Sequence, residues 1–256
     1  MNITRIILLF GIIAAGFLFF NTPQQGAKKD RSVLVVGTSA DYPPYEFIDS
    51  KTGTIVGFDI DVITDVASRL GKTIELKDMS FGSLILGLLS REIDVVAAGM
   101  SPTPRRRKFV SFTHHYLDSD AYVIVSLKDR FLPKSLQDLA GKNVVVNTGY
   151  TAEAYLDQQD IKLHLTRLQT PALALVALQC GSVDAFVCAQ STARAMIEKI
   201  SNPDSIALCV LENTGDNCAF ALSRYAAELT EEINSALDLM RCDGTLERLK
   251  EKWKLS

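Results

Sequence analysis

The sequence predicts an α/β fold built from two similar lobes that two crossing strands join. Three observations along the 256-residue chain support this prediction. Short β-branched runs alternate with segments of helical period, which is typical of a mostly parallel sheet covered by helices. The same order of elements recurs in the second half of the chain. Two extended segments separate the halves, so the chain crosses between the lobes twice if its last helices return to the first lobe.

The N-terminal segment predicts export. Residues 1–5 carry one cation, and residues 6–20 are apolar or small, which matches the charged and apolar regions of a secretory signal. The apolar run is shorter than the ~20 residues that span a bilayer. We therefore expect residues 1–27 to be a signal peptide, with an uncleaved N-terminal anchor as the alternative.

The first half of the chain contains a strand–helix–strand–helix–strand series. The expected elements are a strand at 33–36, a helix at 58–70, a strand at 74–76, a helix at 83–89 and a strand at 95–98. The apolar residues of the first helix fall on one face, and Gly71 ends it. Asp94 directly precedes the last strand.

The second half repeats this order. The expected elements are a strand at 143–146, helices at 151–158 and 172–179, a strand at 185–188, and final helices at 226–240 and 246–253. Asp184 precedes the buried strand, as Asp94 does in the first half. The extended segments 119–125 and 219–222 would form the hinge, and hinged lobes can close on a ligand. The expected lobe limits are 31–118 with 220–256 for the first lobe, and 119–219, including the hinge strands, for the second.

Composition excludes several classes of function. The net charge is −3, the pI is near 5.7 and the basic residues are scattered, which argues against a nucleic-acid partner. The five cysteines form no CxxC pair; export would allow one or two disulfides, and at least one thiol would stay unpaired. The adjacent His114 and His115 would point to opposite sides of an extended segment and make a poor metal pair. We expect no metal and no cofactor.

Four motifs follow one another along the chain. They are GTSADYPPYEF at 37–47, GFDID at 57–61, SPTPRR at 101–106, and GT at 244–245 followed by KW at 252–253. In this order and at this spacing they resemble the polar amino-acid family of periplasmic binding proteins, most closely the branch that binds arginine, lysine and ornithine. The resemblance covers nearly all of the chain after the N-terminal segment.

The resemblance implies a periplasmic binding protein of type II, with two Rossmann-like lobes and no enzymatic activity. It implies a monomer in the periplasm or at the cell surface, which binds a free amino acid, with arginine favoured, and delivers it to the membrane subunits of an ABC transporter. Three alternatives stay open. They are another polar amino acid such as glutamine, a small cyclic-acid dehydratase on the same fold, and an interaction protein that has lost its ligand.

A cation for the ligand carboxylate is expected beside the strand 95–98. The segment 101–106 follows that strand closely, and ligands of open α/β sheets bind at the carboxyl ends of strands. Thr103 and Pro104 would cap and begin a helix there, whose amides favour an anion. The resemblance assigns the carboxylate to Arg106, with Ser101 beside it.

The remaining site residues are implied by the resemblance. It places the backbone amide of Thr151 on the carboxylate and Asn147 near the ligand side chain. Tyr42 and Phe81 would flank a guanidinium, although Phe81 could instead belong to the core. The full expected set is Ser39, Tyr42, Glu46, Phe81, Ala98, Gly99, Met100, Ser101, Arg106, Asn147, Thr151 and Gln190.

Two positions depart from the family pattern. The aspartate that commonly accepts the ligand ammonium is replaced by Ala189, so either Gln190 or another carboxylate would take this role. A frequently acidic position is Ser39. We expect Glu46 to meet the guanidinium of arginine, because a carboxylate and a guanidinium can form a bidentate pair.

Overall fold

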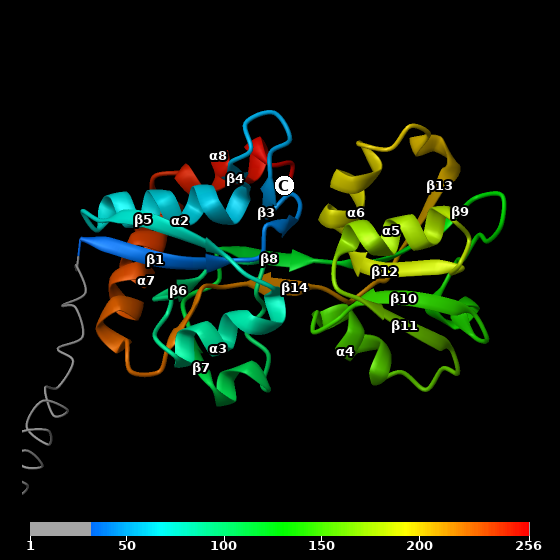
Figure 1. Ribbon diagram of the computed structural model, residues 1–256, viewed down its shortest axis with the longest axis horizontal. Helices are drawn as coiled ribbons and strands as arrows, with labels where there is room; N and C mark the ends of the chain where they lie inside the picture. Colours follow the sequence, from blue (N-terminus) through cyan, green and yellow to red (C-terminus); the bar gives the residue numbers. More distant parts are fainter. Residues whose placement is uncertain (1–31, 256) are drawn as a thin grey trace, which may run out of the picture. The chain divides into compact units, whose positions relative to one another are not determined.

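Two five-stranded sheets organise the computed structural model, which describes residues 32–255 (Figure 1). The predicted signal peptide or anchor, residues 1–27, lies outside the described residues. The first sheet contains β1 (Val33–Thr38), β5 (Thr73–Asp78), β6 (Val95–Val96), β7 (Val110–Phe112) and β15 (Ala221–Ser223), in the order β5-β1-β6-β15-β7. The second contains β9 (Tyr122–Leu127), β10 (Asn143–Asn147), β11 (His164–Leu168), β12 (Ala185–Ala189) and β13 (Ile206–Val210), in the order β11-β10-β12-β9-β13. In each sheet the first three strands of this order pair in the parallel direction, and the two remaining pairings are antiparallel.

Helices cover both faces of the first sheet. The helices α2 (Phe58–Arg69), α7 (Ala227–Cys242) and α8 (Thr245–Lys252) pack on one face, and α3 (Leu84–Leu89) packs on the other (Figure 1). Successive residues of a strand point to opposite faces. Leu34 and Val36 therefore join the core beneath α2, whereas Val35 joins the core beneath α3. We call this sheet and its helices the first lobe.

The second sheet is covered in the same way. The helices α5 (Pro171–Gln179) and α6 (Gln190–Ile197) pack on one face, and α4 (Thr151–Asp157) packs on the other. Within β10, Val145 faces α5, whereas Val144 and Val146 face α4. We call this sheet and its helices the second lobe. An α/β fold with two similar lobes is therefore confirmed.

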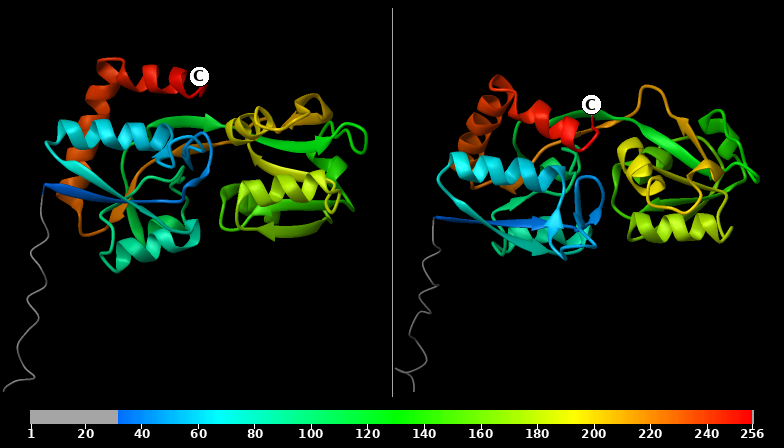
Figure 2. Two further views of the ribbon diagram at one scale, coloured as in Figure 1. Left: turned by 45° about the horizontal axis from the view of Figure 1, so that its top comes forward. Right: turned by 90° about the horizontal axis from the view of Figure 1, so that it is seen from above.

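Two paired strands connect the sheets. The strands β8 (Leu117–Asp120) and β14 (Asp216–Cys218) pair in the antiparallel direction, and both are followed in Figure 2 as the green and orange segments between the lobes. β8 leads into β9 of the second sheet, and β14 leads back towards β15 of the first. The two-strand crossing predicted from the sequence is present, but residues 122–125 and 221–222 of the segments predicted for it belong to β9 and β15 of the two sheets. The residue limits predicted for the lobes stay a prediction.

Several elements were not expected from the sequence. They are the small sheet of β2 (Asp41–Tyr42), β3 (Glu46–Ile48) and β4 (Ile55–Val56), the strands β7, β11 and β13, the helix α6, and the 3₁₀ turns Phe81–Ser83, Arg106–Lys108, Leu136–Leu139 and Pro203–Ser205. β11 and β13 are the outer strands of the second sheet, and their mixed exposure hides the apolar pattern of a buried strand. Among the described residues, no helix has both the length and the apolar character to cross a membrane.

The two aspartates at the internal repeat occupy equivalent positions. The backbone amide of Val35 donates to a carboxylate oxygen of Asp94 (3.0 Å), and the amide of Asn143 donates to Asp184 (2.8 Å). Each aspartate also donates its own amide to the carbonyl of the same partner residue, at 2.8 Å in both lobes. Each carboxylate thus fastens the start of one central strand to the start of its neighbour.

We expect Asp94→Ala and Asp184→Ala each to lower the free energy of unfolding by about 0.5–1.5 kcal/mol, because each loses a side-chain hydrogen bond to a strand amide. The asparagine variants keep an oxygen acceptor and should lose less. Urea unfolding of the four variants measures both effects. Equal losses for alanine and asparagine at either position would contradict this role.

Candidate functional site

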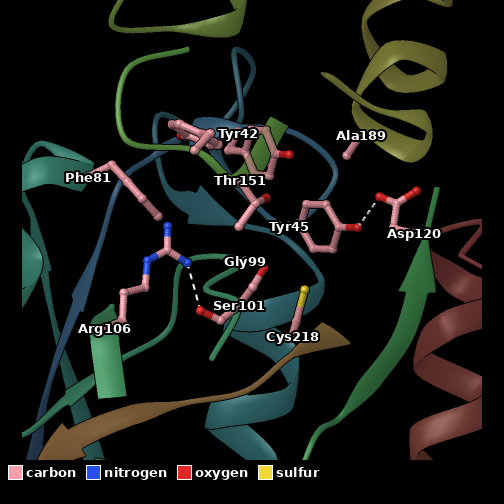
Figure 3. Close-up of a pocket in the computed structure, with 11 residues that line it drawn as sticks. Tyr42, Tyr45, Phe81, Gly99, Ser101, Arg106, Asp120, Thr151, Ala189 and Cys218 are labelled. Carbon is pink, nitrogen blue, oxygen red and sulfur yellow. Dashed lines mark hydrogen bonds between the residues drawn. The ribbon is translucent and has the colours of Figure 1, made fainter. Parts of the chain in front are cut away.

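Residues of both lobes and of the hinge line one pocket. Its empty volume is about 320 Å³, which includes space open to solvent. The first lobe contributes Tyr42, Tyr45, Phe81, Gly99, Ser101 and Arg106, the second contributes Tyr150, Thr151 and Ala189, and the hinge strands contribute Asp120 and Cys218 (Figure 3). Among these described lining residues, Arg106 and Asp120 carry the charged side chains.

The guanidinium of Arg106 is buried and held by backbone carbonyls. Its Nη1 donates to the carbonyl of Ser101 (2.8 Å), and its Nη2 donates to the carbonyl of Gly149 in the second lobe (3.0 Å). Arg106 is only 9% exposed, and its guanidinium carbon lies 5.1 Å from the centre of the Phe81 ring. A carboxylate would be a stronger partner than a neutral carbonyl, because a bond between two ions is about twice as strong.

The segment that carries Arg106 is shorter than the sequence predicted. The prediction that a helix begins at Thr103 and Pro104 is wrong, because the structure forms only the 3₁₀ turn Arg106–Lys108. The hydroxyl of Thr103 still accepts a hydrogen bond from the backbone amide of Arg106 (3.2 Å). The cap therefore fixes the arginine backbone and does not begin a long helix.

A row of aromatic rings crosses the pocket between the lobes. Tyr150 lies 4.9 Å from Tyr42 and 4.5 Å from Phe81, measured between ring centres, and it stacks on Phe81. Tyr42 in turn stacks on Tyr45 at 5.3 Å. The two walls expected for a guanidinium both line the pocket, but the ring of Tyr150 contacts both of them. An arginine side chain sandwiched between Tyr42 and Phe81 would need Tyr150 to move.

The carboxylate of Asp120 lies where the two lobes and the hinge meet. It accepts hydrogen bonds from the hydroxyl of Tyr45 (2.5 Å), from the hydroxyl of Ser191 (2.5 Å) and from the backbone amide of Ser191 (3.1 Å). Tyr45 belongs to the first lobe, and Ser191 lies near the start of α6 in the second. A single hinge residue is therefore bonded to both lobes.

Glu46 is buried in the core of the first lobe and does not line the pocket. It is 0% exposed, and neither carboxyl oxygen has a hydrogen-bond partner among the described residues. Burial raises the pKa of Glu46 well above its ordinary value, and the nearby Asp59 and Asp41 raise it further. The structure thus does not bring Glu46 to the place where a guanidinium would be held.

Burial also raises the pKa of two acids near Glu46, Asp59 and Asp41. Burial raises the pKa of Asp59 to about 7, although the hydroxyl of Tyr116 and the amide of Gly99 donate to its carboxylate and oppose the shift. Burial raises the pKa of Asp41 to about 6, against a hydrogen bond from the hydroxyl of Ser39. Ser39 is itself buried, and neither Ser39 nor Asp41 lines the pocket.

The remaining expected residues divide between the pocket and its surroundings. Gly99, Ser101 and Thr151 line it, whereas Ala98 and Met100 are buried in the core beneath α3. Asn147 and Thr151 line an adjoining pocket with Tyr42 and Tyr150. Gln190 begins α6, is half-buried, and lines neither pocket.

Five lining residues were not expected as site residues from the sequence. They are Tyr45, Asp120, Tyr150, Ala189 and Cys218. Tyr45 lies inside the motif at 37–47, and Tyr150 lies between the expected site residues Asn147 and Thr151. These positions in the sequence could have identified both tyrosines. Asp120 and Cys218 lie on the hinge strands, where sequence shows only extended backbone.

Residues 32–255 contain no group of three histidine, cysteine, aspartate or glutamate side chains placed to hold a metal ion. All five cysteines lie in this range, and no disulfide joins any two of them.

Comparisons with known proteins assign the chain to one family. The family model of the bacterial extracellular solute-binding proteins, family 3, matches residues 34–256. The arginine-binding extracellular protein ArtP of Bacillus subtilis is 32% identical over 249 residues, which cover 96% of this chain and 93% of ArtP.

Two solved structures of an ancestral arginine-binding protein are also similar. The one bound to arginine is 37% identical with a TM-score of 0.81, and the match covers 87% of this chain and 98% of that one. The one bound to glutamine is 36% identical with a TM-score of 0.82, and the match covers 88% and 98%.

The burial of Glu46 predicts a pH dependence of stability. The folded chain holds a proton that the unfolded chain releases above its ordinary pKa of 4.5. The stability contributed by this group is therefore complete below that pH and falls as the pH rises. Glu46→Gln cannot ionise, so the loss of unfolding free energy between about pH 5 and about pH 8 should be smaller in the variant.

Part of the pH dependence of stability should remain in Glu46→Gln, because burial also raises the pKa of Asp59, to about 7. Urea unfolding at the two pH values measures the difference, with Glu75→Gln, an exposed glutamate of β5, as the matched control. An unchanged slope in Glu46→Gln would show that this carboxyl is ionised in the folded protein.

Proposed function

Because the chain belongs to family 3 of the bacterial extracellular solute-binding proteins, we propose that it binds a free α-amino acid in the pocket between its lobes and delivers it to the membrane subunits of an ABC transporter. The chain is a solute-binding protein and not an enzyme. In this proposal the protein acts as a monomer, in the periplasm or at the cell surface.

The observation that carries the proposal is the guanidinium of Arg106 in the pocket. It is buried, fixed by two carbonyls and placed beside Ser101 and Thr151. A fixed guanidinium can bind a carboxylate through two parallel hydrogen bonds. Every α-amino acid presents such a carboxylate, so Arg106 supports the class of ligand without selecting its side chain.

Arginine is the first candidate for the ligand. Support comes from the names of the similar proteins, among them the arginine-binding protein of Bacillus subtilis and the ancestral protein bound to arginine. Glutamine is the second candidate. The burial of Glu46 favours it, because the carboxylate expected to meet a guanidinium lies in the core, and the ancestral protein is also seen bound to glutamine.

Arg106→Ala should abolish the binding of every amino-acid ligand. Removing one partner of a buried charge pair costs about 2–5 kcal/mol. Isothermal titration calorimetry with arginine and with glutamine measures the loss. Arg105→Ala is the matched control, because it removes an exposed guanidinium from the adjacent residue. Near-native affinity in Arg106→Ala would exclude Arg106 from the site.

The ligand should raise the melting temperature, since it binds the folded chain and not the unfolded one. At a ligand concentration of about 100 times the Kd the gain is about 2.7 kcal/mol, and it grows with concentration. A thermal-shift series with arginine, lysine, ornithine, glutamine and histidine ranks the candidates. A flat response to all the proteinogenic amino acids would contradict the proposed function.

A further inference from the structure

We propose that Asp120, on the hinge strand β8, accepts the α-ammonium group of the bound amino acid while Arg106 holds its α-carboxylate. The inference rests on the proposed function and adds to it the residue that distinguishes a free α-amino acid from a simple carboxylic acid. It also decides between the two acceptors that the sequence left open, which were Gln190 and a carboxylate from elsewhere in the chain.

The α-ammonium of a bound amino acid must find its acceptor close to Arg106. Its nitrogen lies only about 2.5 Å from the carboxyl carbon, because a single tetrahedral carbon separates the two groups. When Arg106 holds the carboxylate, the acceptor of the ammonium therefore belongs to the same pocket. A charge enclosed between two lobes is costly unless it is paired and hydrogen-bonded, so this acceptor should be an anion.

Asp120 supplies the carboxylate among the described residues that line this pocket or the adjoining one. The acids of the first two sequence motifs that are buried or nearly so, Asp41, Glu46 and Asp59, line neither pocket. Gln190 lines neither pocket either, and its amide could offer only a neutral oxygen. Asp120 is thus the described group that can balance the charge of an ammonium beside Arg106.

Backbone hydrogen bonds hold Asp120 next to the end of β12. Ala189 is the last residue of that strand. The backbone amide of Gln190, the next residue, donates to the carbonyl of Ala121 (2.8 Å). The amide of Ser191 then donates to the carboxylate of Asp120 (3.1 Å). The end of β8 and the end of β12 therefore lie side by side at the pocket.

The small side chain of Ala189 leaves room for an ammonium beside this carboxylate. Figure 3 shows Ala189 next to Asp120, with Ser101 and Thr151 between Asp120 and Arg106. Ala189 adds only a methyl group to the lining. The position at which the sequence led us to expect an acid is thus neutral, and the neighbouring strand brings a carboxylate to the same part of the pocket.

The carboxylate of Asp120 is fixed and can still accept a hydrogen bond. An ionised carboxylate offers about four acceptor positions on its two oxygens. The hydroxyls of Tyr45 and Ser191 donate to Oδ2, and the amide of Ser191 donates to Oδ1. These three donors leave a position for the ammonium. They also orient the carboxylate before the ligand arrives, which reduces the entropy lost on binding.

The test compares an amino acid with its desamino analogue, which keeps the carboxylate and the side chain but lacks the ammonium. The analogue is δ-guanidinovalerate for arginine, ε-aminocaproate for lysine and glutaramate for glutamine, and the pair is chosen by the strongest of the three in the thermal-shift series. Calorimetric titration of the wild-type chain should show at least about tenfold tighter binding of the amino acid, as expected for one charge-assisted hydrogen bond. Equal affinities for the two would overturn the inference.

Asp120→Asn should weaken the amino acid and leave the analogue nearly unchanged, so that the ratio of the two dissociation constants approaches one. Asp118→Asn is the matched control, because it makes the same change on the same strand at an exposed side chain, and it should leave the ratio at its wild-type value. A wild-type ratio in Asp120→Asn, or an equal loss for both ligands, would overturn the role of Asp120.

A further variant separates the charge of Asp120 from its structural bonds. Ser191→Ala removes a hydroxyl donor to Asp120 but keeps the negative charge, so it should retain the preference for the amino acid even if both ligands bind more weakly. Loss of the preference in Ser191→Ala would contradict the inference. A wild-type chain that binds no proteinogenic amino acid would instead overturn the proposed function itself.

Discussion

The buried guanidinium of Arg106 is the interaction on which the pocket depends. It links a carbonyl that follows β6 in the first lobe to the carbonyl of Gly149 in the second. Burying a cation is costly unless it is hydrogen-bonded, and both carbonyls reduce that cost in the conformation in which the lobes approach each other. The polar lining of the pocket, the aromatic row and the hinge carboxylate are all arranged around this one fixed charge.

Two buried acids with raised pKa values lie behind the pocket. Glu46 and Asp59 are completely buried, and burial raises the pKa of both carboxyls. Asp59 is bonded to the amide of Gly99, which lines the pocket. Asp59 therefore holds the backbone of Gly99 in place at the pocket, although burial disfavours the charged form of its carboxyl group. Solute-binding proteins need such a rigid floor, since a preformed site loses less entropy when it binds.

The sequence predicted the parts of the fold and site that are local in the chain. The repeat of Asp94 and Asp184 could be read directly, because each lies one residue before a buried strand, and both occupy equivalent positions in the sheets. The place of Arg106 in the lining could be predicted because its motif closely follows a strand and resembles the corresponding motif of the family. Glu46 could not, because the side chains of a strand alternate between two faces, and the sequence does not say which face the core covers. Asp120 could not either, because its partners Tyr45 and Ser191 are 75 and 71 residues away.

The row of rings from Phe81 through Tyr150 and Tyr42 to Tyr45 has an optical consequence. Three of the four rings belong to the first lobe and one to the second, so any separation of the lobes breaks the row at Tyr150. Closely packed tyrosines in a fixed chiral arrangement give near-ultraviolet circular dichroism, and that signal reports on side-chain packing. The single tryptophan, Trp253, instead packs edge-on against Phe47 and donates to Asp61, both in the first lobe. Tyrosine dichroism is thus a built-in, label-free gauge of lobe opening, while tryptophan emission follows the integrity of one lobe.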